Sequence, residues 1–465
     1  MPLILGTNSI KDTGFNVANS CRFNDGSSDH MLKTASAGNR RTFTFSTWFK
    51  RGQLSTNQQF FTSYSAANAG GFAYMQLEIP ESGVIGDRIS LEVYGTILLK
   101  TNQVLRDPSA WYHLVIAVDT TNATANNRCR MYLNGTEITS FATRNNPDEN
   151  FDFAYNQDSI DLVLASNNYN DTKGNYFDGY LAETVWIDGT QYAASDFGEF
   201  DDSGIWKPIN VSGLTFGTNG FYLDYKASGN LGNDANGGTD LTEANLTAID
   251  QSTDTCTNNF ATMNPLDNFY YNGTFSEGNL KGINGSGREA SATATIAISN
   301  GKWFWEVQPK TNVAPFIGIQ QSPSAANTSS GASMSTNGYG YLKTGKVETS
   351  DGSGGSTVLA EYATYAADDI IGVAVDLDGN KIYFYKNGAL QGSGVTITAV
   401  GSTTNGHYLI AFGALGGQDT FEVNFGSPPF AISSGNTDGD GFGNFEFAVP
   451  SGYFALCTKN LAEYG

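Results

Sequence analysis

The sequence predicts an all-β protein, and three observations lead to this fold class. Aromatic residues make up 13% of the 465 positions, which is typical of chains rich in strands. Glycine occupies 54 positions without a Gly-X-Y period, which excludes collagen and favours many turns. Alternating apolar and polar residues recur along the chain, whereas no long stretch keeps the period of a helix. We therefore expect two tandem antiparallel β-sandwich (jelly-roll) domains.

The first half contains four segments with a strand pattern. Phe43 and Phe45 lie on one face of the first segment, with threonine and serine on the other. The second segment is more continuously apolar, as expected of a strand in the middle of a sandwich. Asn134-Gly135 interrupts the third, and this pair favours a type I′ hairpin turn. The segments are residues 42–48, 111–118, 130–138 and 179–189.

The second half has the same character, and a polar stretch separates the two halves. Asn387-Gly388 predicts a second hairpin, and residues 227–254 are rich in Gly, Asn, Asp, Ser and Thr, which is typical of a linker. The predicted strands are residues 302–307, 370–375, 381–386, 409–412 and 421–425. We expect a first sandwich over residues 1–240, a linker over 241–269, a second sandwich over 270–450 and a C-terminal segment over 451–465.

The charge of the chain limits its partners. Twenty-five basic against 46 acidic residues give a net charge of −21. Such a chain repels nucleic acids and anionic membranes, so neither is an expected partner. We find no signal-peptide pattern at the start and no apolar run of about 18 residues, so we expect synthesis in a cytoplasm and no membrane insertion. The four dispersed cysteines are expected to be free thiols, with Cys129 buried beside the 130–138 hairpin.

The residue inventory argues against catalysis. The three histidines are far apart in sequence, and the HExxH, GxSxG and P-loop patterns are absent. His113 lies in an apolar strand, where we expect a structural histidine rather than a base. The acidic pairs Glu199 with Asp201 and Asp148 with Glu149 lie in loop-like segments, not on a strand face. We therefore expect a non-enzymatic protein.

One segment near the C-terminus suggests a cation site. Asn436, Asp438 and Asp440 place side-chain oxygens at alternate positions, with Gly441 at the sixth position. This is how a calcium loop begins, because Ca²⁺ takes six to eight oxygens. The twelfth position holds Phe447 instead of glutamate. An Asx-rich turn without metal explains the same residues, so the sequence implies no required cofactor and leaves calcium as an alternative.

Two tyrosines are the candidate ligand-binding residues. Tyr339 and Tyr341 lie between the polar segments 322–337 and 350–356, which are too hydrophilic to form core. Their rings offer flat apolar faces to a sugar or a peptide. The same rings are equally compatible with the core of a sandwich, and that alternative stays open.

Motifs in each half resemble known families. The first half resembles the laminin-G-like, concanavalin-A-like jelly rolls. The resemblance rests on the strand 43–48, the strand 111–118 followed by Asp119, the hairpin 132–135 and the strand 179–189. The second half resembles SPRY domains on five ordered motifs, and this resemblance implies a SPRY sandwich. The motifs are Gly301 to Val307, Phe316 to Ile319, Asp369 to Asp376, Ile382 to Gly388 and Asn424-Phe425-Gly426.

Nearly the whole chain also resembles large proteins of tailed bacteriophages that infect aquatic bacteria. The resemblance rests on Asn19 to Asn24, Arg106 to His113, Tyr176 to Tyr180, Gly217 to Leu223, Thr257 to Phe260 and Ser451 to Thr458. It implies a virion protein, such as a tail fibre or fibre-like protein, that contacts other virion proteins and a bacterial surface glycan or protein. It also implies a homotrimer. A capsid decoration protein without host contact and a polysaccharide depolymerase are the alternatives.

Overall fold

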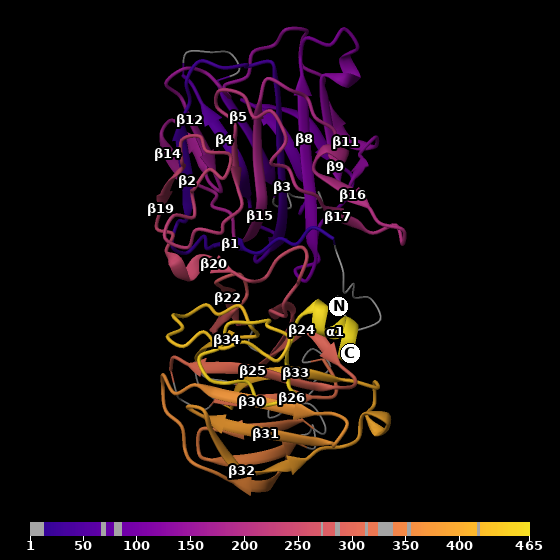
Figure 1. Ribbon diagram of the computed structural model, residues 1–465, viewed down its shortest axis with the longest axis vertical. Helices are drawn as coiled ribbons and strands as arrows, with labels where there is room; N and C mark the ends of the chain where they lie inside the picture. Colours follow the sequence, from indigo (N-terminus) through magenta and orange to yellow (C-terminus); the bar gives the residue numbers. More distant parts are fainter. Residues whose placement is uncertain are drawn as a thin grey trace. The chain divides into compact units, whose positions relative to one another are not determined.

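The computed structural model divides the chain into two compact units, which we call the first and the second sandwich (Figure 1). The first comprises Thr13–Thr257 and the second contains Asn258–Gly465. The residues that the structure describes are 14–66, 71–78, 86–270, 273–283, 289–311, 315–323, 338–350, 355–415 and 419–465. Residues 241–257 lie within the first sandwich, so the expected linker over 241–269 differs from the observed division.

Two antiparallel sheets form the first sandwich. One has the strand order β10 (Thr136–Glu137), β9 (Cys129–Leu133), β8 (Trp111–Asp119), β3 (Thr42–Arg51), β15 (Gly179–Asp188), β1 (Ser20–Phe23) and β20 (Gln251–Ser252), with β18 (Phe221–Leu223) beside β15. The other has the order β11 (Phe141–Arg144), β7 (Thr96–Thr101), β6 (Ile89–Val93), β5 (Phe72–Leu77), β4 (Gln58–Tyr64), β12 (Asp161–Leu164), β2 (His30–Thr34) and β19 (Thr242–Ala244).

Short elements decorate the first sandwich. Two of them are hairpins outside the main sheets, and the others are single 3₁₀ turns. The hairpins are β13 (Asn167–Tyr169) with β14 (Thr172–Gly174) and β16 (Gly198–Phe200) with β17 (Trp206–Pro208). The 3₁₀ turns are Ala125–Asn127, Ala194–Asp196 and Ala248–Asp250.

The second sandwich has the same two-sheet plan. One sheet has the order β21 (Met263–Tyr270), β24 (Glu289–Ile298), β33 (Tyr408–Leu415), β26 (Pro315–Gln320), β27 (Tyr339–Leu342), β28 (Lys346–Ser350) and β29 (Ser356–Glu361). The other has β22 (Thr274–Ser276), β23 (Lys281–Ile283), β34 (Thr420–Asn424), β25 (Lys302–Pro309), β30 (Ile371–Asp376), β31 (Lys381–Lys386) and β32 (Ala389–Thr396), with β35 (Phe454–Ala455) parallel to β25. A 3₁₀ turn at Val400–Ser402 and the helix α1 (Thr458–Tyr464) complete it.

The predicted all-β fold class and its two hairpins are confirmed. Asn134 and Gly135 connect β9 to β10 with φ angles of 47° and 78°. Asn387 and Gly388 connect β31 to β32 with φ angles of 48° and 79°. Two successive residues with positive φ define the type I′ turn, and asparagine followed by glycine adopts it at the lowest steric cost.

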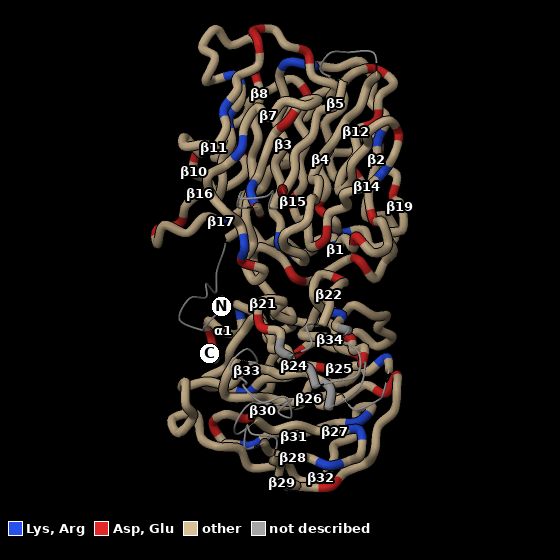
Figure 2. Tube along the Cα trace, turned by 180° about the vertical axis from the view of Figure 1, so that it is seen from behind, with Lys and Arg blue, Asp and Glu red and all other residues tan. Residues whose placement is uncertain are grey.

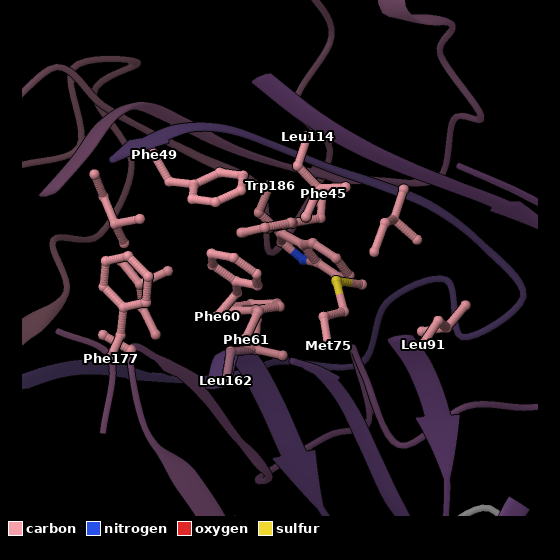
Figure 3. Close-up of a cluster of buried hydrophobic side chains, with 14 of the residues drawn as sticks. Phe45, Phe49, Phe60, Phe61, Met75, Leu91, Leu114, Leu162, Phe177 and Trp186 are labelled. Atoms are coloured by element: carbon pink, nitrogen blue, oxygen red, sulfur yellow. The ribbon is translucent and has the colours of Figure 1, made fainter. Parts of the chain in front are cut away.

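Aromatic side chains from both sheets fill the core of the first sandwich (Figure 3). Phe45 and Phe49 on β3 meet Phe60 and Phe61 on β4, and Trp186 on β15 packs 4.8 Å from Phe61 between ring centroids. Burying each such ring contributes about 2 kcal/mol through removal of apolar surface from water. The two sheets are therefore joined face to face by this layer.

The second sandwich has its own core, and three of the strands expected from the sequence contribute to it. Trp303 and Trp305 on β25 are fully buried, with Val373 on β30 and Phe384 on β31. Residues that follow β34 then cover the outer face of β25, where Phe304 packs against Phe445 with ring centroids 5.3 Å apart. The second sandwich therefore includes a covering segment that follows its last main strand.

In each sandwich, the first and the last segment of the unit lie next to each other. In the first, Cys21 on β1 pairs with Gln251 on β20, and the Val17 amide donates to the Thr257 hydroxyl at 3.0 Å. In the second, Phe260 forms a β-bridge with Cys457, and the Thr458 amide donates to the Asn259 carbonyl at 2.9 Å. The entering and leaving ends of each unit are thus hydrogen-bonded to each other.

The structure contains four unpaired cysteines, of which Cys21, Cys129 and Cys457 are buried and Cys256 is half-buried. Cys129 was expected beside the 130–138 hairpin. It is the first residue of β9, which forms that hairpin with β10. Across the described part of the chain, no helix combines the length and the apolar character needed to cross a membrane.

Candidate functional site

The face of β4 to β7 that points away from the core carries the most distinctive surface of the first sandwich. Ala73, Met75 and Leu77 on β5 point into the core, as do Ile89, Leu91 and Val93 on β6. Since successive side chains alternate between the faces of a strand, the intervening residues lie on the outer face. Strand register aligns Gln59 with Gln76, Gln76 with Ser90, and Tyr74 with Glu92.

One half of this outer face is aromatic, and we call it the aromatic platform: Tyr64, Phe72, Tyr74, Tyr94 and Tyr169. Tyr169 comes from the β13–β14 hairpin and packs on Tyr64 and Phe72, with ring centroids 5.2 and 5.3 Å away. Tyr94 lies nearly parallel to Tyr169, with an interplanar angle of 10° and centroids 6.1 Å apart. Tyr94 is 62% exposed and Tyr169 41% exposed, so their rings are open to solvent.

The other half is a polar network, which we call the polar row: Gln59, Gln76, Glu78, Ser90, Glu92 and Lys100. Glu92 is its centre, because its carboxylate accepts hydrogen bonds from Tyr74 Oη at 2.6 Å, Gln76 Nε2 at 2.9 Å and Ser90 Oγ at 2.6 Å. Gln59 Nε2 lies 3.4 Å from Gln76 Oε1. Tyr74 belongs to the platform and binds Glu92, so it joins the two halves.

Burial governs the electrostatics of the polar row. Lys100 Nζ lies 2.6 Å from Glu78 Oε2, and both side chains are 11% exposed. Burial raises the pKa of the Glu78 carboxyl, while the hydrogen bond and the charge of Lys100 oppose that shift. Burial, followed by the hydrogen bond to Glu92, raises the pKa of Tyr74, so the phenol stays protonated as a donor. The second oxygen of Glu78 and the carbonyl oxygen of Gln59 are buried acceptors without a hydrogen bond.

The sequence-predicted tyrosines do not form a binding surface. Tyr339 is 6% exposed and Tyr341 is fully buried, and both belong to the core of the second sandwich. Tyr341 Oη donates to the Ala363 carbonyl, and Tyr339 Oη lies 3.0 Å from the Thr398 hydroxyl. The ligand-binding interpretation is therefore corrected in favour of the core alternative, because both rings point inward from β27. Most of the flanking segments 322–337 and 350–356 lies outside the described residues.

The predicted calcium residues form a hydrogen-bonded turn instead. Asp438 accepts from the amides of Asp440 and Phe442 at 3.0 and 2.9 Å and from Ala455 N and Asn460 Nδ2 at 2.9 and 2.7 Å. Donors pointing at both carboxylate oxygens occupy the positions that a cation would need. Asn436 forms a β-bridge with Phe445. Asp438 therefore forms the Asx-rich turn that the sequence offered as an alternative.

The third predicted residue has a separate role. Asp440 accepts a hydrogen bond from Tyr464 Oη at 2.9 Å and lines a cavity of about 430 Å³ beside α1. Among the described residues, no group of three or more His, Cys, Asp or Glu side chains is placed to hold a metal ion. Asn436, Asp438 and Asp440 thus serve the packing of the C-terminal segment.

His113 is a structural histidine, as expected. Trp206 Nε1 donates to His113 Nδ1 at 3.0 Å, which leaves the ring proton on Nε2. Nε2 therefore donates to Ser46 Oγ, 2.9 Å away, and cannot remove a proton from it. Burial lowers the pKa of His113 to about 3, so the ring stays neutral. The Ser46–His113 pair has the spacing of a catalytic dyad. In a dyad, however, the nitrogen that faces the hydroxyl is unprotonated, whereas here it carries the proton.

The β4–β7 face was missed in the sequence, although a signal was present. Tyr74, Gln76 and Glu78 alternate with core residues, and so do Ser90, Glu92 and Tyr94. Two nearby strands that each place polar and aromatic residues on the same face indicate a second, polar and aromatic face of the sheet opposite the core. Their alignment across the sheet depends on register, which the sequence alone does not give.

The fold and this surface define a class: a chain of two β-sandwich modules in which the first bears an aromatic and polar outer face. The first sandwich matches the Laminin_G_3 family model, described as the Concanavalin A-like lectin/glucanases superfamily, over residues 25–195. The second matches the SPRY domain model over residues 302–428. The chain therefore carries a Laminin_G_3 domain followed by a SPRY domain, and the two families expected from the motifs are confirmed in that order.

Other similarities are more distant. The chain is 28% identical over 145 residues to "E3 ubiquitin-protein ligase RKP" of Arabidopsis thaliana, a match that covers 30% of this chain and 10% of that relative. This chain thus spans about a tenth of the length of that relative. The SPRY domain of human HERC1 is 13% identical, with 35% of this chain and 96% of that chain covered and a TM-score of 0.28. A putative carbohydrate binding protein from Bacteroides ovatus is 12% identical, with 49% and 58% covered and a TM-score of 0.34.

Proposed function

We propose that this protein is a non-enzymatic recognition protein whose first sandwich binds carbohydrate at the β4–β7 face. The observation that carries the proposal is the pair of exposed, nearly parallel rings of Tyr94 and Tyr169 beside the hydrogen-bonded polar row. The sugar ring has an apolar face that packs on aromatic rings and hydroxyls that need hydrogen-bonding partners. The platform offers the apolar contact, and the polar row beside it, although its side chains are largely buried, supplies the polar groups nearest to that contact.

The arrangement of the carboxylates supports binding without catalysis. A glycosidase needs one carboxyl group that donates a proton and a second that acts as base or nucleophile. Here the Glu92 oxygens are occupied by Tyr74, Gln76 and Ser90, and Glu78 is held by Lys100. Both carboxyl groups therefore have structural partners, which favours a binding face over an active site.

The biological setting of the proposal rests on the sequence motifs shared with tailed-bacteriophage proteins. In that setting the chain is a virion component, such as a tail-fibre-like protein, that is synthesised in the host cytoplasm, contacts other virion proteins and forms homotrimers. Its target is a glycan of the bacterial surface. The rigid strands present the platform, while loops at the rim are free to vary.

Glycan-array binding and adhesion to bacterial envelopes test this proposal. The double variant Tyr94→Ala/Tyr169→Ala is expected to lose binding at least about tenfold, since two stacking contacts disappear. Phe200→Ala is the matched control, because Phe200 is 52% exposed on β16 of the same sandwich and does not belong to the platform. Unchanged binding by the double variant overturns the site. Release of reducing sugar from the bound glycan would instead support a depolymerase.

A further inference from the structure

We propose that the β4–β7 face selects its glycans by charge: it accepts neutral and amine-bearing sugars and rejects acidic polysaccharides. This inference rests on the proposed carbohydrate binding and adds the chemical class of the ligand. It is carried by the charges that lie on and around the face.

The charges of the polar row leave one carboxylate uncompensated. Glu78 and Lys100 neutralise each other, with Lys100 Nζ 2.6 Å from Glu78 Oε2. Glu92 accepts from three neutral groups, and no Lys or Arg of the described ranges forms an ion pair with it. Glu92 lies next to the platform, because it accepts the hydrogen bond of Tyr74, whose ring centroid lies 4.5 Å from that of Phe72.

The hairpin that carries Tyr169 adds a further acidic group. Asp171 is exposed at the turn between β13 and β14. Lys173 pairs with Asn168, whereas Tyr169 pairs with Thr172, so the lysine lies on the other side of the hairpin from Tyr169. The acidic group is therefore at the tip beside the platform, and the lysine faces away from Tyr169.

The remaining cation of this face is distant from the platform. Arg88 precedes β6, and Tyr94 follows the same strand. At about 3.3 Å per residue the two positions lie about 20 Å apart. This exceeds the Debye length of about 8 Å at physiological salt, so Arg88 does not offset the acidic groups near Tyr94.

The charge of the whole chain acts in the same direction. The excess of acidic over basic residues gives −21, and acidic residues are distributed along both sandwiches (Figure 2). A uronate or sulfated polymer approaching the platform is therefore repelled, most strongly at low salt. An ammonium group is attracted, because an aromatic face with a carboxylate behind it stabilises a cation.

Three oligosaccharides of equal length test the inference: a β-linked glucosamine oligomer, its N-acetylated form and a galacturonate oligomer. Affinities are measured by calorimetry at low and physiological salt. We expect the galacturonate oligomer to bind at least about tenfold more weakly than the two others, with the difference shrinking as salt increases. Equal or tighter binding of galacturonate overturns the inference and leaves carbohydrate binding intact. Failure of all three, together with an empty glycan array, overturns both.

Two charge variants assign the effect to the face. Glu78→Gln leaves the Lys100 ammonium without its partner, and we expect galacturonate affinity to rise about fivefold. Glu92→Gln removes the uncompensated charge, and we expect the affinity for the glucosamine oligomer to fall by a similar factor. Glu361→Gln is the control, because it changes the net charge equally from β29 of the second sandwich. If Glu92→Gln does not fold, Lys100→Met is used instead, because it removes a positive charge from the face where Glu92→Gln removes a negative one. Unchanged selectivity between the oligosaccharides in these variants contradicts the inference.

Discussion

In the first sandwich the final segment, residues 247–257, is held by basic side chains, whereas in the second the final segment, residues 436–460, is held by amide groups. Lys50 Nζ lies 2.7 Å from Asp254 Oδ2, and both side chains are 1% exposed. Arg22 is fully buried and lies 3.4 Å from Asp250. Trp111 Nε1 also donates to Asp254, at 3.1 Å.

In the second sandwich two buried carboxylates do the same task without a cation. Glu306 on β25 accepts from Asn424 Nδ2 at 3.1 Å and from the amides of Glu446 and Phe447 at 3.0 and 2.9 Å. Asp438 accepts from four nitrogen donors. Neither carboxylate forms an ion pair within the described ranges.

A buried carboxylate is thus tolerated in two ways, and these have different consequences. A cationic partner keeps the acid ionised. Removal of that partner leaves a buried charge without compensation. Amide donors satisfy the oxygens but do not cancel the charge, so burial raises the pKa of Glu306 to about 7. The final segment of the first sandwich is therefore sensitive to loss of a partner, and that of the second to the pH. Burial also raises the pKa of Glu183 on β15 of the first sandwich to about 7, so pH dependence is not confined to the second sandwich.

The largest effect is expected from Lys50→Met. The substitution keeps the length of the side chain but leaves the Asp254 carboxylate buried without its cation, at an expected cost of about 4 kcal/mol. Urea unfolding measures the loss, and hydrogen exchange of the peptides containing β1 and β20 locates it. A cost below about 1 kcal/mol would show that the other contacts of Asp254, including the hydrogen bond from Trp111, suffice to hold it.

Asp438→Ala is expected to have the next largest effect. Four donors lose their acceptor, and we expect the second sandwich to lose about 3 kcal/mol of stability. Faster hydrogen exchange over residues 440–460, with unchanged exchange in the first sandwich, is the predicted signature.

Calcium provides the matched control for that variant. If Asp438 serves the turn, millimolar calcium and a chelator leave the melting temperature of the unmodified protein unchanged. A rise in melting temperature with calcium that Asp438→Ala abolishes would restore the metal interpretation of the 436–447 segment.

Glu306 is expected to make the stability of the second sandwich depend on pH. The pKa of Glu306 rises from 4.5 to about 7 on folding, so the folded state binds the proton more tightly. Its contribution to stability is therefore fully present below about pH 4.5 and is lost as the pH rises to about 7, by up to about 3 kcal/mol. Glu306→Gln should flatten this part of the stability profile of the second sandwich, as followed by chemical unfolding at several pH values. An unaltered slope would assign the dependence to other groups.

Arg41→Ala should have the smallest effect. Arg41 and Asp152 form an ion pair at 2.7 Å, but their side chains are 42% and 43% exposed. Water and salt screen such a pair, so we expect no measurable change in melting temperature. A clear destabilisation would mean that surface pairs, not buried ones, account for the sensitivity of the first sandwich.

The sequence predicted the strands and hairpins well, because these depend on local signals. The 42–48 and 111–118 patterns became β3 and β8, and both Asn-Gly pairs formed the expected turns. The strands near the end of the first sandwich were missed, because β19 and β20 are short, lack apolar alternation and form by pairing with β2 and β1. Composition alone made that segment look like a linker.

The candidate site was less predictable, since it depends on which face of a strand is covered. Tyr339 and Tyr341 are chemically as suited to a sugar as Tyr94 and Tyr169, but their strand β27 points both rings into a core. The Asp438 turn shows the same limit, because its donors include Ala455 and Asn460, which the chain brings back from later positions. Long-range pairing, not residue type, separates the buried tyrosines from the exposed ones.

The joined ends of each sandwich have a consequence for rearranging the chain. Because β1 lies beside β20 and Phe260 beside Cys457, the start and finish of each module can be connected by a short peptide without stretching either sheet. Each module is thus suited to circular permutation, with new termini opened at the β9–β10 or β31–β32 turn. It is also suited to insertion as a cassette into a surface loop of another protein, since a host loop needs to spread only slightly to accept both ends.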